Sequence, residues 1–96
     1  MADSIKPNLQ DVPVIPGRFR LQWEPAQNSH VLLYPEGMVQ LSDTAAEILK
    51  RINGTASVLI IVEELERSFP GAALRADVME FLEVAQERGW ITFERR

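Results

Sequence analysis

The sequence predicts a winged-helix-like α+β fold, in which a three-stranded antiparallel sheet is followed by three helices and a short C-terminal strand or tail. Three observations lead to this prediction. Apolar residues follow strand patterns over residues 18–41, they recur with the 3.6-residue period of a helix over residues 42–88, and glycine or proline separates most of the segments. The 96 residues are long enough for one modest core.

The first two strands are predicted from their hydrophobic patterns. Residues 18–24 alternate apolar and polar side chains, so one face of this strand is buried and the other is wet. Residues 30–34 are apolar at almost every position, which suits a strand covered on both faces. A loop at residues 25–29, which starts with proline, joins the two strands.

The third strand follows a tight turn. The turn at residues 35–37 reads Pro-Glu-Gly, and it combines the fixed φ of proline with the positive φ that glycine accepts. Residues 38–41 form a short strand that we expect at the edge of the sheet, where backbone donors and acceptors stay unpaired. The two faces of this strand alternate, with Val39 and Leu41 on one and Met38 and Gln40 on the other.

Three amphipathic helices follow the sheet. The first begins after Ser42, a favourable N-cap, and stops at Asn53-Gly54. The second, residues 57–68, contains a β-branched run, but its apolar stripe keeps the helical period and predicts a helix. The third spans residues 74–88 and ends at a glycine. The inward side chains of the third helix are Leu74, Val78, Phe81, Leu82 and Ala85.

The domain boundaries are predicted from the prolines and from the ends of the pattern. Residues 1–17 carry three of the six prolines, and we expect a flexible, extended arm. Residues 18–93 are expected to fold as a single domain, with residues 90–93 as its final strand or packed tail. Residues 94–96 are expected to fray.

The composition argues against an enzyme. His30 is the only histidine and the chain has no cysteine, so one chain cannot build a usual zinc site or a Ser-His or Cys-His pair. The five glycines are isolated from one another, which excludes a glycine-rich phosphate loop. We therefore expect no catalytic residues, no metal and no cofactor.

Charge and hydrophobicity indicate where the protein acts. The longest apolar run, residues 58–62, is far shorter than the roughly 20 residues of a membrane span. The N-terminus has no apolar stretch typical of a signal peptide, so we expect a cytoplasmic protein with no membrane partner. Residues 74–88 hold two arginines against four acidic residues, a net charge of −2, which repels phosphate. A nucleic acid partner is therefore not expected.

The features that could bind a partner are the open edge of the predicted sheet and the apolar side chains that the core does not need. An extended peptide can add to such an edge, held by main-chain pairing and selected by apolar pockets. The same edge also suits coverage by the N-terminal arm or by a second copy, and the pattern leaves this choice open. Apolar side chains off the main helical stripes, which are candidates for lining a groove, are Leu59, Ile60, Met79 and Val84.

Most of the chain, roughly residues 16–90, resembles the PqqD family. The length, order and spacing of several segments agree together, namely residues 18–24, residues 32–41, residues 44–49, Asn53-Gly54, Asp77-Val78 and Phe81-Leu82. The resemblance implies a non-catalytic, stand-alone recognition domain of pyrroloquinoline quinone (PQQ) biosynthesis. It also implies that the domain captures the precursor peptide PqqA and presents it to PqqE, a radical S-adenosylmethionine enzyme whose iron–sulfur clusters supply the chemistry.

The resemblance also implies a binding site. In related domains the leader peptide adds as a strand beside the third strand and packs against the third helix. The implied peptide-binding residues are Met38, Val39, Gln40 and Leu41 in the strand, and Val78, Phe81, Leu82 and Ala85 in the helix. The exposed helix positions Arg75, Met79 and Glu83 are further candidates. A Val39→Pro substitution is expected to remove a backbone donor and to weaken peptide binding.

Two alternatives belong to other functional classes. The first is a small oligomeric module, monomer or homodimer and possibly strand-exchanged, whose open edge pairs with itself. The second is a carrier of the quinone product, with Trp23, Tyr34 and Trp90 as stacking surfaces.

Overall fold

A computed structural model describes residues 6–94 of the chain. The elements follow in the order β1 (Val12–Val14), β2 (Arg20–Glu24), β3 (Ser29–Tyr34), β4 (Gly37–Gln40), α1 (Asp43–Lys50), α2 (Val58–Ser68), α3 (Arg75–Glu87) and β5 (Thr92–Glu94). Strands β2, β3 and β4 form an antiparallel sheet in that order, and β1 pairs with β5. The predicted α+β class, with its three-stranded sheet, three helices and C-terminal strand, is confirmed.

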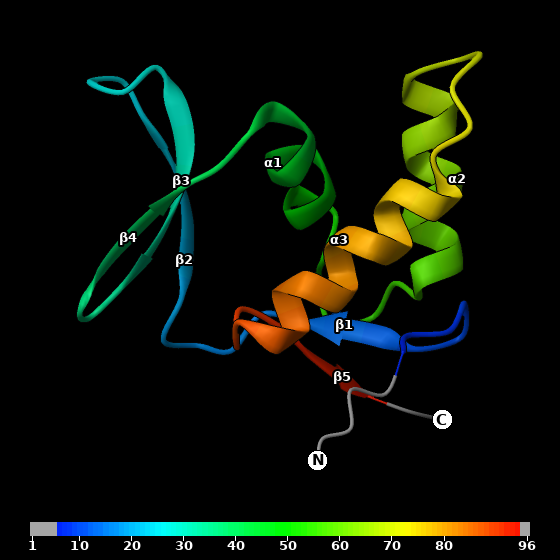
Figure 1. Ribbon diagram of the computed structural model, residues 1–96, viewed down its shortest axis with the longest axis horizontal. Helices are drawn as coiled ribbons and strands as arrows, with labels where there is room; N and C mark the ends of the chain where they lie inside the picture. Colours follow the sequence, from blue (N-terminus) through cyan, green and yellow to red (C-terminus); the bar gives the residue numbers. More distant parts are fainter. Residues whose placement is uncertain (1–5, 95–96) are drawn as a thin grey trace.

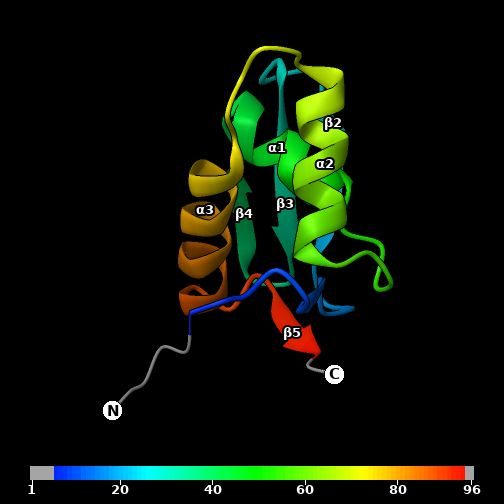
Figure 2. The ribbon, with the colours of Figure 1, turned by 90° about the vertical axis from the view of Figure 1, so that its right-hand side faces the viewer.

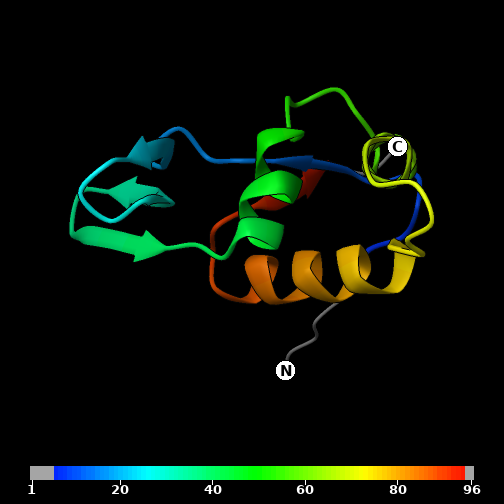
Figure 3. The same cartoon turned by 90° about the horizontal axis from the view of Figure 1, so that it is seen from above.

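The three-stranded sheet stands at one side of the molecule and the helices at the other (Figure 1). Helix α1 lies between them and packs on β3, while α2 packs on both α1 and α3. Figure 2 shows α3 on the same side of the molecule as β4, and α2 on the side of β2. The view from above separates the sheet, α1 and the α2–α3 pair (Figure 3).

The core lies between one face of this sheet and the helices. Leu21, Leu32 and Val39 stand opposite one another across the strands, and Leu32 is fully buried at the centre of this row. Burying a leucine or isoleucine contributes about 1.5–3 kcal/mol. The helices supply most of the other buried apolar side chains, among them Ile48, Leu49, Val58, Ile61, Val62, Leu65, Val78, Leu82 and Ala85.

Two serines set the starts of the first two helices. The Ser42 hydroxyl accepts a hydrogen bond of 3.1 Å from the backbone N–H of Ala45, and the Ser57 hydroxyl accepts one of 3.3 Å from that of Ile60. Such N-caps stabilise a helix by about 1 kcal/mol. The helical reading of the β-branched run in α2 is confirmed.

Residues 6–17 differ from the flexible arm predicted for residues 1–17. Residues 12–14 form β1, which pairs with β5 at the other end of the chain. The carbonyls of Leu9 and Asp11 accept hydrogen bonds of 3.0 and 2.9 Å from Leu59 and Val58. These two N–H groups belong to the first turn of α2, where a helix offers no partners of its own. The segment is thus extended, as the prolines require, but it is packed into the fold.

Other boundaries shift by a few residues. The first strand of the sheet starts at Arg20, because Phe19 donates a hydrogen bond of 3.0 Å to the Pro16 carbonyl in a turn. The last strand is Thr92–Glu94, so Glu94 belongs to a strand and not to the predicted frayed tail. Residues 1–5 of the arm and residues 95–96 of the tail lie outside the described residues.

Candidate peptide-binding site

The outer edge of β4 is the first part of the candidate site. Strand β4 pairs with β3, and no other strand within residues 6–94 pairs with it. Leu41, just after β4, donates a hydrogen bond of 3.0 Å to the His30 carbonyl of β3. In an antiparallel pair every second residue bonds to the neighbour, so Val39 bonds to β3 as well. Met38 and Gln40 therefore direct their backbone N–H and C=O groups outward, toward an added strand.

The hydrogen bonds between β3 and β4 show that Val39→Pro is the wrong substitution for testing the outer edge of β4. The N–H of Val39 points toward β3, so Val39→Pro damages the sheet itself and does not report on the outer edge. A proline at Gln40 removes an outward N–H and leaves the bonds to β3 in place. The residue pattern alone gave the face of each side chain but not the direction of each N–H.

The four candidate side chains of this strand divide between its two faces. Met38 is 43% exposed and Gln40 is also exposed. Val39 is half-buried against the core and Leu41 is buried. The predicted alternation of faces is confirmed, and it leaves Met38 and Gln40 as the side chains on the outer face of the sheet.

Three of the four candidate helix residues lie in the core. Val78, Leu82 and Ala85 are at most 1% exposed, so their main contribution is to position α3. Phe81 is half-buried, and its ring centroid lies 6.4 Å from that of Trp90. Phe81 is therefore the only one of the four whose side chain is not fully buried.

An exposed flank of α3 runs beside this buried stripe. Asp77, Phe81, Val84 and Arg88 are spaced four, three and four residues apart, which places them along one side of the helix. Val84 is 37% exposed, and the Arg88 guanidinium stacks over the Trp90 ring at 5.5 Å from its centroid. Val84 lies off the main apolar stripe of the helix, and this position in the sequence made it a candidate for lining a groove.

The remaining helix candidates lie elsewhere on α3. Met79 and Glu83 line a surface hollow together with Lys6 and Pro7, so the N-terminal segment lies against their flank. Arg75, in the first turn, is exposed. Because α3 lies on the same side of the molecule as β4 (Figure 2), the flank that bears Phe81 and the outer edge of β4 are the parts most suited to one extended ligand.

The charged groups nearby are mostly acidic, and one is tightly paired. The Glu47 carboxylate of α1 lies 2.8 Å from the Lys50 ammonium and 2.8 Å from the Arg51 guanidinium. Hydrogen bonds from Lys50, and next from Arg51, hold the pKa of Glu47 below its ordinary value. This pairing therefore stabilises the fold at neutral pH, and its contribution is lost as the pH falls through the lowered pKa.

The single histidine and the acidic side chains are the groups that could serve an acid, a base or a metal. His30 packs edge-on against Trp23, with ring centroids 5.2 Å apart. Within residues 6–94 no three histidine, aspartate or glutamate side chains gather as metal ligands. In the same part of the chain no helix has the length and apolar character needed to cross a membrane.

Comparisons with known proteins point in one direction. Residues 29–91 match the family model described as coenzyme PQQ synthesis protein D (PqqD). The PqqA binding protein of Azotobacter vinelandii is 56% identical over 84 residues, which cover 86% of this chain and 91% of that protein. The PqqA binding protein of Pseudomonas paraeruginosa is 49% identical over 89 residues, which cover 92% of this chain and 97% of that protein.

A solved structure agrees with these sequence matches. The solution NMR structure of the PqqD part of Methylobacterium extorquens PqqCD, described as a stand-alone recognition element for ribosomally synthesised and modified peptides, superposes with a TM-score of 0.71. It is 33% identical in sequence, and the match covers 92% of this chain and 94% of that one. Together the family model, the close relatives and the shared fold establish that the chain belongs to the PqqD family.

Proposed function

We propose that this protein is a non-catalytic chaperone that binds the PqqA precursor peptide in the cytoplasm. Support comes from the relatives, which are named PqqA binding proteins, and from the solved neighbour, which is described as a peptide recognition element. The single observation on this chain that carries the proposal is the outer edge of β4, where Met38 and Gln40 turn their backbone groups away from β3.

In this proposal the peptide adds as a strand along β4. Its main chain bonds to Met38 and Gln40, and its side chains meet the exposed flank of α3 at Phe81 and Val84. The buried residues Val78, Leu82 and Ala85, together with Leu41, hold the two elements in place from beneath. An added strand with a few seated side chains reaches a Kd on the order of 1 μM, which allows both capture and release.

We further propose that the bound peptide is handed to PqqE, the radical S-adenosylmethionine enzyme. A chaperone that presents its peptide binds the enzyme while loaded. Titration of PqqE with this protein, with and without PqqA, is expected to give a ternary complex. Mutually exclusive binding of PqqA and PqqE would contradict presentation but leave peptide binding intact.

Calorimetric titration of the purified protein with synthetic PqqA tests peptide binding. We expect saturable binding that persists at high salt, because strand addition and apolar contacts need few released counterions. A collapse of affinity with salt would indicate that ionic contacts hold PqqA and would contradict strand addition as the main source of affinity. Absence of binding by a folded monomer would overturn the proposed function.

A proline at Gln40 tests the edge. Gln40→Pro removes one outward N–H and is expected to weaken PqqA binding about tenfold or more, since a lost hydrogen bond and a steric clash act together. Gln40→Ala is the matched control, because it removes the side chain and keeps the N–H. Equal affinities of the two folded variants, checked by circular dichroism, would rule out strand addition at this position.

A further inference from the structure

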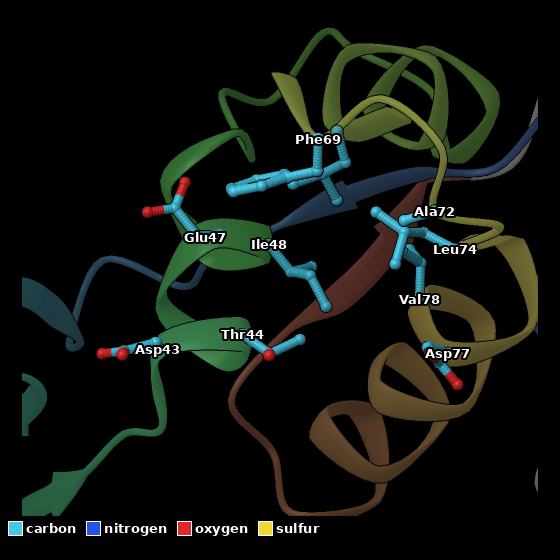
Figure 4. A pocket seen from close by; sticks show the side chains of 10 residues that line it. Asp43, Thr44, Glu47, Ile48, Phe69, Ala72, Leu74, Asp77 and Val78 are labelled. Carbon is cyan, nitrogen blue, oxygen red and sulfur yellow. The ribbon is translucent and has the colours of Figure 1, made fainter. Parts of the chain in front are cut away.

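An apolar hollow lies between α1 and the first turns of α3, apart from the contacts assigned to the peptide so far. It has a volume of about 290 Å³. Figure 4 shows Ile48 and Thr44 of α1 on one wall, pointing toward Leu74 and Val78 on the other, with Phe69 at the end of α2 closing one side. A dry cavity of about 150 Å³ holds a benzene molecule. This hollow therefore has room for one bulky side chain.

The lip of the hollow exposes apolar surface to water. Phe69 is 46% exposed although it is a large aromatic side chain, and it follows the last turn of α2. Ala72, in the loop between α2 and α3, is exposed beside it and also lines the hollow. An apolar group inserted into the hollow would remove both the Phe69 ring and the apolar lining from water. Such burial is favourable, so the arrangement suits an apolar ligand group.

Three acidic residues stand at the rim of this hollow, and their carboxylates point away from its apolar interior. Asp43 and Glu47 of α1 and Asp77 of α3 line the hollow (Figure 4). The carboxylate of Glu47 is bonded to Lys50 and Arg51. Among residues 6–94 no basic side chain forms a salt bridge with Asp43 or Asp77. The rim thus complements a cationic side chain next to the apolar one.

The hollow also lies along the path of the proposed strand. Asp43 comes three residues after Gln40, so the chain passes directly from β4 into the first turn of α1. A strand that pairs with β4 and continues for a few residues, at about 3.3 Å each, reaches this turn. α3, the opposite wall, lies on the same side of the molecule as β4 (Figure 2).

We infer that this hollow is the anchor site for the precursor peptide, and that it takes one bulky apolar side chain flanked in the peptide by a lysine or arginine. The inference rests on the proposed function, because it names the part of PqqA that secures the complex. Pairing along β4 sets the direction of the peptide. The hollow selects the side chain that anchors it and so fixes the register of the peptide on β4.

Filling the hollow tests this inference. Ala72→Phe places a ring where the peptide side chain would sit, and we expect it to weaken PqqA binding about tenfold or more. Ala73→Phe is the matched control, since Ala73 is the exposed neighbour that does not line the hollow, and we expect a change of less than about twofold. Equal effects of the two substitutions would overturn the inference.

An alanine scan of the apolar residues of PqqA identifies the anchor. One truncation is expected to weaken binding to the wild-type protein about tenfold and to have almost no further effect on Ala72→Phe. Additive losses for every truncation would overturn the assignment of the hollow. Nuclear Overhauser effects between a PqqA side chain and the methyl groups of Ile48 and Leu74 provide a test that needs no variant, and their absence in the saturated complex counts against the inference.

The rim is tested separately. Asp43→Asn with Asp77→Asn is expected to weaken binding about threefold at low salt and to flatten its mild salt dependence, whereas Glu63→Gln, at an exposed position of α2, leaves both unchanged. If the double variant binds as the wild type does, no flanking cation is recognised. Failure of the wild-type protein to bind PqqA contradicts the proposed function itself. Normal wild-type binding with Ala72→Phe equal to Ala73→Phe contradicts only the anchor.

Discussion

Leu32 and Leu33 are adjacent in β3 and chemically identical, yet the sheet turns them to opposite faces. Leu32 is fully buried between Leu21 and Val39 against the helices, whereas Leu33 is half-buried on the other face opposite Met38. This difference of environment, set by the two-residue period of a strand, decides what each side chain contributes to stability.

Truncation of these two leucines is expected to have unequal effects. Leu32→Ala opens a cavity in the core and should lower the free energy of unfolding by about 2–5 kcal/mol. Leu33→Ala, the same change one residue on, removes a partly exposed side chain and should cost about 1 kcal/mol or less. Urea denaturation monitored by circular dichroism measures both values. Equal losses would mean that Leu33 is covered as completely as Leu32, as the apolar run over residues 30–34 predicts.

At the scale of single elements, the helices and the sheet were predictable because their signals are local. Ser42 and Ser57 cap the helices that follow them, and the helical stripe of α2 outweighs its β-branched residues. Strand β1 has no such signal. It is three residues long with a proline at its centre, and it exists because Thr92–Glu94 at the far end of the chain pairs with it. A pattern within a short window cannot report a partner that distant.

Removal of residues 1–14 therefore tests an element that the sequence did not predict. The deletion takes away β1 and the Leu9 and Asp11 carbonyls that accept from the first turn of α2. We expect a fall in the midpoint of thermal unfolding, at roughly 4–8 °C for each kcal/mol lost in a domain of this size. Faster amide hydrogen exchange at Val58 and Leu59 is expected as well. An unchanged midpoint of thermal unfolding, with unchanged amide exchange, would show that the segment contributes nothing to stability, as predicted for a flexible arm.

At the scale of the whole molecule, packing leaves more of the candidate strand residues than of the candidate helix residues exposed. The period of α3 identifies its most apolar stripe, and that stripe packs inward on the rest of the core, so Val78, Leu82 and Ala85 are buried. In the proposed complex the peptide meets the neighbouring flank, which bears Phe81 and Val84. Sequence patterns indicate that a helix has an apolar side, but only the packing of all the elements decides which side stays open.

The open edge of β4 is equally available to a peptide and to a second copy of the chain. Unpaired strand edges favour association, and within residues 6–94 no other strand blocks this one. If the protein dimerises through β4, saturating PqqA should compete and return it to the mass of a monomer in light scattering. Gln40→Pro should be monomeric with or without peptide, while Gln40→Ala should behave as the wild type. A dimer that keeps its mass when saturated with PqqA would place self-association on another surface and leave β4 to the peptide, because one strand edge cannot pair with both partners at once.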